Sequence, residues 1–252
     1  MNLPDAALAT SPTTPPSLLQ RFAASRFGQA LVALLMAAGL TWLSFRLLPA
    51  LLRFWDAALL HLLSWLPLSD AMAGRMSLEL PLWGEFETPA IQLWLAAADS
   101  QAWLGNLGGA ALLFLLASLL RPALRSVVRA LAGFHLATLL LQAASPLDYD
   151  VAQHTHHLAV ISIGLLLSLP LVMAATHYIV ERSHERRLLA TLMIAAFLVL
   201  SLPLKLLAHA ALLQFMSPLA MPTLFLVFGP AFDILCVSAL YAWAITWRHH
   251  AG

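Results

Sequence analysis

Long apolar stretches separated by short polar or charged links dominate the chain. A helix that spans a bilayer needs about 20 mostly apolar residues. Six stretches suit such helices, at 29–48, 107–120, 131–144, 158–180, 188–212 and 222–247. The second is the shortest and reaches spanning length only by including residues from Ala102 onwards. The pattern predicts an all-α, polytopic integral membrane bundle of about six transmembrane helices.

The segment between the first two stretches has a different pattern. Residues 51–65 are apolar around most of a helix circumference, which predicts a helix lying at the outer membrane interface. Alternating leucines then follow at positions 78, 80 and 82, which indicates a β-hairpin turning near Trp83-Gly84. Six of the eight tryptophans lie within 42–103, as in a belt at headgroup level.

These patterns divide the chain into four parts. We expect a flexible cytoplasmic tail at 1–27, a first transmembrane helix at 28–49, an outer-face (periplasmic) insert at 50–105 and a five-helix transmembrane bundle at 106–248. The tail is rich in Pro, Thr, Ser and Ala and has no basic start, so it does not resemble a signal peptide.

The distribution of Lys and Arg predicts the orientation, because basic residues favour the cytoplasmic side. With the N-terminus inside, nine of the thirteen fall on the inner side. They are Arg21, Arg26, Arg121, Arg125, Arg129, Arg182, Arg186, Arg187 and Arg248. Both termini are therefore expected in the cytoplasm. The Ala- and Leu-rich usage and the compact loops suit a bacterial inner membrane.

Composition excludes several classes of protein. Apolar residues make up 61% of the chain and charged residues 10%, with a mean hydropathy of +0.84. A soluble domain carries about a quarter charged residues. The net charge of +1 gives no indication of a nucleic-acid partner. The single cysteine, Cys236, excludes an intramolecular disulfide. The expected partners are the lipid bilayer and other membrane or periplasmic proteins.

The densest polar cluster precedes and opens the fourth apolar stretch, at 145–157. If the helix begins early, Asp150, His154 and His157 fall at i, i+4 and i+7 on one face. Two imidazoles and a carboxylate would suit Zn, Cu or Fe(II). The alternative is a solvated loop whose histidines sit at the interface. A transition metal is thus one candidate cofactor.

Polar residues inside the later stretches form a second candidate site. Asp233 follows Gly229-Pro230, where the sixth helix is expected to kink. Lys205 and His209 lie one turn apart in the fifth helix, and Lys205 is long enough to reach towards Asp233. Together with His135 of the third helix, these residues suggest a proton or ion site. A buried salt bridge that fixes helix packing is the alternative.

Haem and enzymatic chemistry find little support. His135 and His177 both lie towards the inner side and could pair as axial haem ligands, but nothing else in the sequence supports haem. There is no Gly-rich phosphate loop. Because no motif indicates a reaction, a non-enzymatic role is favoured.

Three functions remain. The leading hypothesis is a non-catalytic accessory or structural subunit of a bacterial inner-membrane complex, which docks partners through the Trp-rich insert. The alternatives are a metal-binding membrane protein using Asp150, His154 and His157, and a small proton-coupled transporter using Asp233.

Overall fold

Seven α-helices, two short 3-10 helices (labelled η) and one β-hairpin make up the computed structural model, which describes residues 25–66, 68, 71–80, 84–95, 98–145, 150–180 and 183–246. The elements are α2 (Arg26–Leu63), β1 (Met72–Leu80), β2 (Gly84–Gln92), α3 (Ser100–Leu116), η1 (Ala117–Leu119), α4 (Pro122–Ala144), α5 (Val151–Val180), α6 (His184–Met216), η2 (Pro218–Ala220), α7 (Met221–Phe228) and α8 (Pro230–Thr246). Within these residues, six helical stretches are long and apolar enough to cross a membrane. The all-α class is therefore confirmed.

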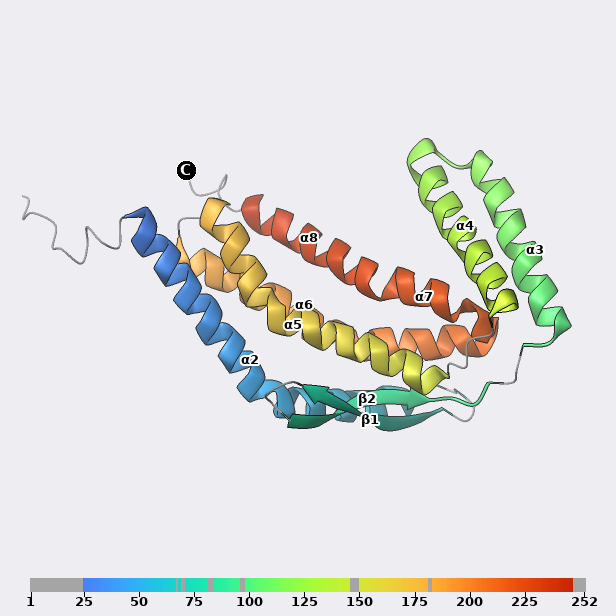
Figure 1. Cartoon of the computed structure of the whole chain (residues 1–252), viewed down its shortest axis with the longest axis horizontal. Coiled ribbons are helices and arrows are strands. Elements are labelled where there is room, and N and C mark those ends of the chain that lie inside the picture. Colours follow the sequence, from blue (N-terminus) through green and yellow to red (C-terminus); the bar gives the residue numbers. More distant parts are fainter. Residues whose placement is uncertain are drawn as a thin grey trace, which may run out of the picture.

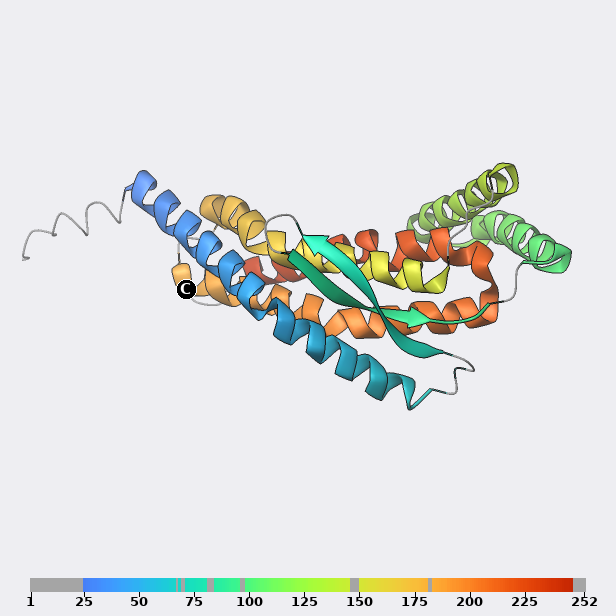
Figure 2. The same cartoon turned by 60° about the horizontal axis from the view of Figure 1, so that its bottom comes forward.

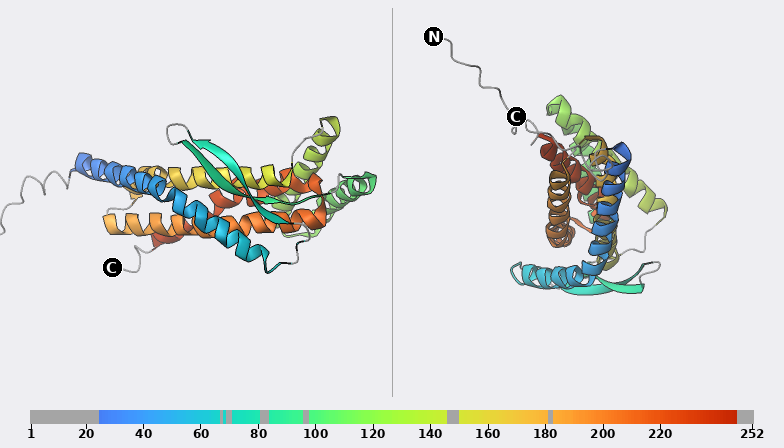
Figure 3. Two further views of the ribbon diagram at one scale, coloured as in Figure 1. Left: turned by 90° about the horizontal axis from the view of Figure 1, so that it is seen from below. Right: turned by 90° about the vertical axis from the view of Figure 1, so that its left-hand side faces the viewer.

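The first helix is longer than the sequence suggested. We expected one helix to end near residue 48 and a separate interfacial helix to follow, but α2 is continuous through Pro49. The helix bends along its length, so its second half runs in a different direction from the first (Figure 3). That second half has an apolar stripe at helical spacing, and its residues Leu48, Leu52, Trp55 and Leu59 are all buried. Packing of this stripe holds the bent helix against α5 and α6.

Trp55 of α2 makes a hydrogen bond that Pro203 removes from the backbone of α6. Pro203 has no backbone N–H, so the carbonyl of Val199 one turn earlier loses its helical partner. The Trp55 indole Nε1–H donates to that oxygen at 2.8 Å. The buried Trp55 ring thus satisfies a carbonyl that would otherwise be left without a hydrogen bond.

The predicted hairpin is confirmed. β1 and β2 pair antiparallel from Met72↔Gln92 to Leu80↔Gly84. Gly84 has a φ of +91°, a conformation that side chains disfavour. The sheet lies along α5 (Figures 1 and 2), where the Ile91 N–H donates to Thr155 Oγ1 at 2.9 Å. Trp83, at the expected turn, lies outside the described residues.

Several helices begin earlier than the apolar pattern alone indicated. Asp99 caps α3 by accepting from the Ala102 N–H at 2.7 Å, so the short second stretch gains residues at its start. Pro122 opens α4, which makes the basic link helical. α5 starts at Val151, seven residues before the expected position, and includes His154 and His157.

The elements form three groups. α5, α6, α8 and the first half of α2 make the main bundle, and the α3–α4 pair stands beside it (Figure 1). The second half of α2 and the hairpin form a layer along one side of that bundle (Figure 3). The largest buried cluster joins α2, the hairpin, α5 and α6. The polar residues of interest therefore lie between helices fixed by an apolar core.

We expect Trp55→Phe to lower the free energy of unfolding by about 1–3 kcal/mol, because it leaves the Val199 oxygen buried without a donor. In a Pro203→Ala background, the new backbone N–H can pair with that oxygen, so the same substitution should cost much less. Unfolding of all four proteins in mixed micelles measures this cycle. An equal cost in both backgrounds would contradict the account.

Candidate functional site

Three polar side chains meet inside the main bundle, one each from α5, α6 and α8. The Lys205 ammonium donates to both carboxylate oxygens of Asp233 at 2.6 Å and to Ser162 Oγ at 2.9 Å. The Ser162 hydroxyl donates to Asp233 Oδ2 at 3.4 Å. Asp233 is 0% exposed and Lys205 is 5% exposed. The charges are thus shielded from the surroundings, and Lys205 reaches Asp233 as the sequence led us to expect.

A break in the last apolar stretch presents Asp233 to this site. α7 ends at Phe228 and α8 begins at Pro230, which confirms the predicted kink at Gly229-Pro230. A Cβ at position 229 would overlap the Phe225 carbonyl oxygen and lie 2.9 Å from Leu158 Cδ2, so only glycine fits there. The break places Asp233 in the first turn of α8, where the helix dipole favours a negative charge.

Two histidines form a second buried contact, between α5 and α6. His154 Nε2 and His209 Nδ1 are 2.8 Å apart, and both residues are 0% exposed. One ring must donate and the other accept in such a contact. Two imidazolium ions would turn N–H groups towards each other, so this geometry accommodates at most one added proton. Phe225 and Phe228 of α7 pack edge-on against His154 and His209 respectively.

The two contacts are neighbouring layers of one polar column. His209 follows Lys205 by four residues, so the two lie on one face of α6 about 6 Å apart along its axis. On α5, His154 precedes Ser162 by eight residues, which is about 12 Å of helix. The histidine layer is therefore nearer the start of α5, and the Lys205–Asp233 layer is deeper in the bundle.

The two ends of the column differ. A cavity of about 240 Å³ lies at the start of α5, lined in part by Asp150 and Trp94. Asp150 is exposed and sits one helical turn before His154. In the other direction along α8, Val237 and Leu240 pack into the apolar core, together with the buried Ala244. The described part of the column thus approaches solvent at the start of α5 and meets apolar packing on the other side.

The residues proposed as metal ligands lie in different surroundings. Asp150 accepts from the Gln153 N–H at 2.7 Å as a helix cap. His154 turns into the bundle, whereas His157 is exposed. Three residues advance a helix by about 300°, so His157 is offset from the buried face that His154 occupies. Among the described residues, no three His, Cys, Asp or Glu side chains gather closely enough to hold a metal ion.

His135 belongs to a separate polar group. Its Nδ1 lies 2.8 Å from Thr223 Oγ1 on α7, and its Nε2 lies 3.2 Å from Asn106 Oδ1 on α3. His135 therefore joins three helices away from the column. The side chain of His177, considered with His135 for haem, lies outside the described residues.

The sequence did not reveal Ser162 or the pairing of His154 with His209. Ser162 is offset from His154 by about 80° around α5, towards the side on which Leu158 and Ala159 are also buried, and this position within an apolar buried face could have identified it. The histidine pair had no comparable signal, because its partners are 55 positions apart on different helices.

The sequence matches no protein-family model, and no curated protein or solved structure is significantly similar to it.

We expect Lys205→Met to be strongly destabilising, by about 3–5 kcal/mol, because it leaves the Asp233 carboxylate buried without its counter-charge. The double variant Lys205→Met/Asp233→Leu removes both charges and should recover most of that loss. Unfolding in mixed micelles measures both. If the double variant has the same free energy of unfolding as Lys205→Met, the loss of stability does not arise from an unpaired Asp233 charge.

Proposed function

We propose that the chain is an integral membrane protein with both termini in the cytoplasm, in a membrane of the bacterial inner-membrane type. The six apolar helices support insertion. The start of α2, the end of α5, the α3–α4 corner and the end of α8 all lie towards the upper side of Figure 1, and the hairpin lies on the lower side. Arg121, Arg125 and Arg129 belong to the α3–α4 corner and the start of α4, and Arg186 belongs to the start of α6, which supports a cytoplasmic location for these helix ends.

Within this membrane, we propose that the polar column is the proton site of a small proton-coupled transporter. The observation that carries the proposal is the buried Asp233–Lys205–Ser162 contact with the His154–His209 pair one turn away. A charged side chain at the centre of a membrane helix costs about 2.5–3.5 kcal/mol on insertion scales. Apolar side chains would hold three helices together without that cost, so a column of five polar side chains is better explained by a role in proton transfer.

The geometry suggests a route for the proton. It begins at the outer cavity beside Asp150, continues to His154 one turn along α5, and crosses the 2.8 Å contact to His209. Imidazoles suit this step because one ring nitrogen accepts a proton while the other releases one. Lys205 lies one turn beyond His209 and donates to Asp233 at 2.6 Å, so it would pass one of its own protons to the carboxylate and take a replacement from His209, which makes Asp233 the final acceptor.

Protonation of Asp233 would change how the helices hold together. A neutral carboxyl group no longer offsets the Lys205 charge, so the contact between α6 and α8 weakens. The Gly229-Pro230 break allows α8 to move relative to α7. The apolar packing around Val237 and Leu240 closes the inner side, which favours alternating access over an open channel.

We expect Asp233→Asn to abolish protein-dependent proton flux in liposomes under an imposed potassium diffusion potential, because asparagine cannot take up the proton. Glu79→Gln is the matched control, since Glu79 is an exposed carboxylate of the hairpin, and it should conduct like the wild type. Wild-type liposomes without protein-dependent flux, or equal flux in Asp233→Asn and the wild type, would contradict the proposal.

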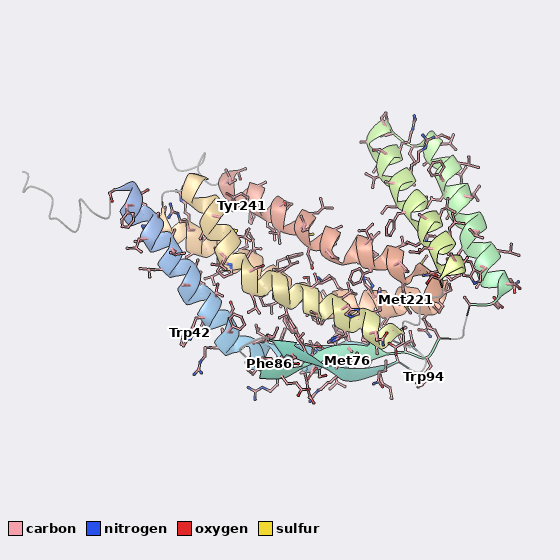
Figure 4. All side chains as sticks on the ribbon, viewed as in Figure 1. Trp42, Met76, Phe86, Trp94, Met221 and Tyr241 are labelled. Atoms are coloured by element: carbon pink, nitrogen blue, oxygen red, sulfur yellow. The ribbon has the colours of Figure 1, made fainter. Side chains whose placement is uncertain are left out.

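A second candidate function is that of an accessory subunit in a membrane complex. Large apolar side chains of the insert are unusually exposed, with Trp94 at 86%, Trp65 at 71% and Met72 at 59%. Trp94 lies just past the end of β2, away from the main bundle (Figure 4). Such side chains suit a protein contact, although tryptophans at this level also suit a lipid interface. The strands themselves expose charged residues instead, including Arg75, Glu79 and Glu87.

The accessory role predicts a partner at Trp94. A photoreactive amino acid introduced at this position should give one cross-linked product of defined mass in native membranes. The same group at Leu119, which is 80% exposed at the α3–α4 corner, should not give that product. Identical cross-linking patterns at the two positions, or none at either, would argue against docking through the insert.

A further inference from the structure

A second feature of the fold is the separation between the α3–α4 pair and the main bundle. The pair leans away from α8, and its main contacts with the rest of the described chain are to α7 and η2 (Figure 1). Met221, at the start of α7, lies beside the foot of α4 (Figure 4). A cleft lies between the α3–α4 pair on one side and η2 and α7 on the other, and no described segment of the chain fills it.

This cleft has a volume of about 440 Å³, within the range of small-molecule pockets at about 300–1,000 Å³. On α3 its lining extends from Ala102 to Leu113, which is about 16 Å of helix. Small residues form much of its wall. A Cβ placed at Gly105 or Gly109 would meet nothing within 4 Å, so open space extends up to the backbone of α3.

The polar groups of the cleft are concentrated near its outer part. His135 of α4 links Asn106 of α3 to Thr223 of α7, and Asn106 Nδ2 also donates to Ser217 Oγ at 3.3 Å. The deeper lining, including Ala110 and Leu113, is apolar. In the membrane orientation proposed above, the polar part faces the outer surface and the apolar part points to the bilayer centre. A lipid of the outer leaflet has the same polarity.

The size of the cleft decides between possible occupants. A helix about 10 Å across and 16 Å long would fill roughly 1,250 Å³, nearly three times the volume present. A small polar molecule would leave the apolar wall unmatched. One extended hydrocarbon chain fits a long, narrow and mainly apolar space. Its polar head would then lie beside Asn106 and His135, at the polar end of the cleft.

We propose that this cleft binds a single-chain lipid, with its head at His135 and Asn106 and its chain running along α3 past Gly109. The site is distinct from the polar column, and the proposal rests on the membrane orientation but not on proton transfer. α7 lies between the two sites, since Thr223 and Leu224 line the cleft while Phe225 and Phe228 pack on the histidine pair.

Two neighbouring glycines give a matched test of the chain position. Gly109 lines the cleft, whereas Gly108 does not, and a Cβ at either has no neighbour within 4 Å. Full-length protein in nanodiscs would be labelled with a photoreactive, clickable palmitic acid and mapped by peptide. We expect wild-type labelling to concentrate on the cleft-lining peptides of α3, α4 and α7. Gly109→Phe should lower it at least five-fold, and Gly108→Phe should change it less than two-fold.

Equal labelling of the two variants, or wild-type labelling spread evenly over all lipid-facing helices, would overturn the proposal. If Gly109→Phe does not fold, Gly105→Leu takes its place against the same control.

The head position is tested by His135→Leu, which should reduce labelling by the fatty acid but not by a photoreactive hexadecane. Equal loss with both probes would contradict the assignment of the head. Unchanged proton flux in Gly109→Phe does not count against the lipid site, because lipid binding is measured by photolabelling and proton transfer by flux in liposomes.

Discussion

The pairing of Lys205 with Asp233 is the constraint around which the main bundle is organised. Either charge alone would be costly in apolar surroundings, so α6 and α8 must hold the two groups within hydrogen-bonding distance. This requirement accounts for the helix break at Gly229-Pro230, which brings Asp233 into the first turn of α8 and close to α5. Ser162 then satisfies a further hydrogen bond of the pair.

The Lys205–Asp233 pair could serve only to fix helix packing or could take part in proton transfer, and the two roles predict different surroundings for the pair. A salt bridge that only fixes packing needs no neighbouring titratable groups. Here a second buried layer, His154 with His209, lies one turn away and towards the exposed start of α5. The aromatic rings of α7 cover both histidines. A buried histidine pair between the exposed start of α5 and the Lys205–Asp233 contact supports proton movement better than it supports packing alone.

α7 also relates the two proposed sites. It is a short helix with the lipid-sized cleft on one side and the histidine pair on the other, and it ends at the break that precedes Asp233. A ligand that changes the position of α7 would therefore alter the surroundings of the proton site. Coupling between a bound lipid and the column has a physical basis in this shared element.

Much of the fold followed from local patterns in the sequence. Apolar length identified the six helical stretches, leucine alternation identified the hairpin, and Gly229-Pro230 identified the break. The continuity of α2 through Pro49 was missed, because proline normally interrupts a helix and the buried stripe around Trp55 overrides it. The metal interpretation assumed that Asp150, His154 and His157 act together, whereas packing against α6 turns His154 inward. Spacing along one helix cannot show which face a second helix will cover.

Infrared difference spectroscopy of the protein in lipid tests the central claim most directly, because it detects protonation of a carboxyl group in an apolar environment. If Asp233 takes up the proton, acidification of wild-type protein produces such a carboxyl band, and Asp233→Asn removes it without unfolding the protein. An unchanged band in Asp233→Asn, or no titrating buried carboxyl in the wild type, would show that Asp233 serves packing alone.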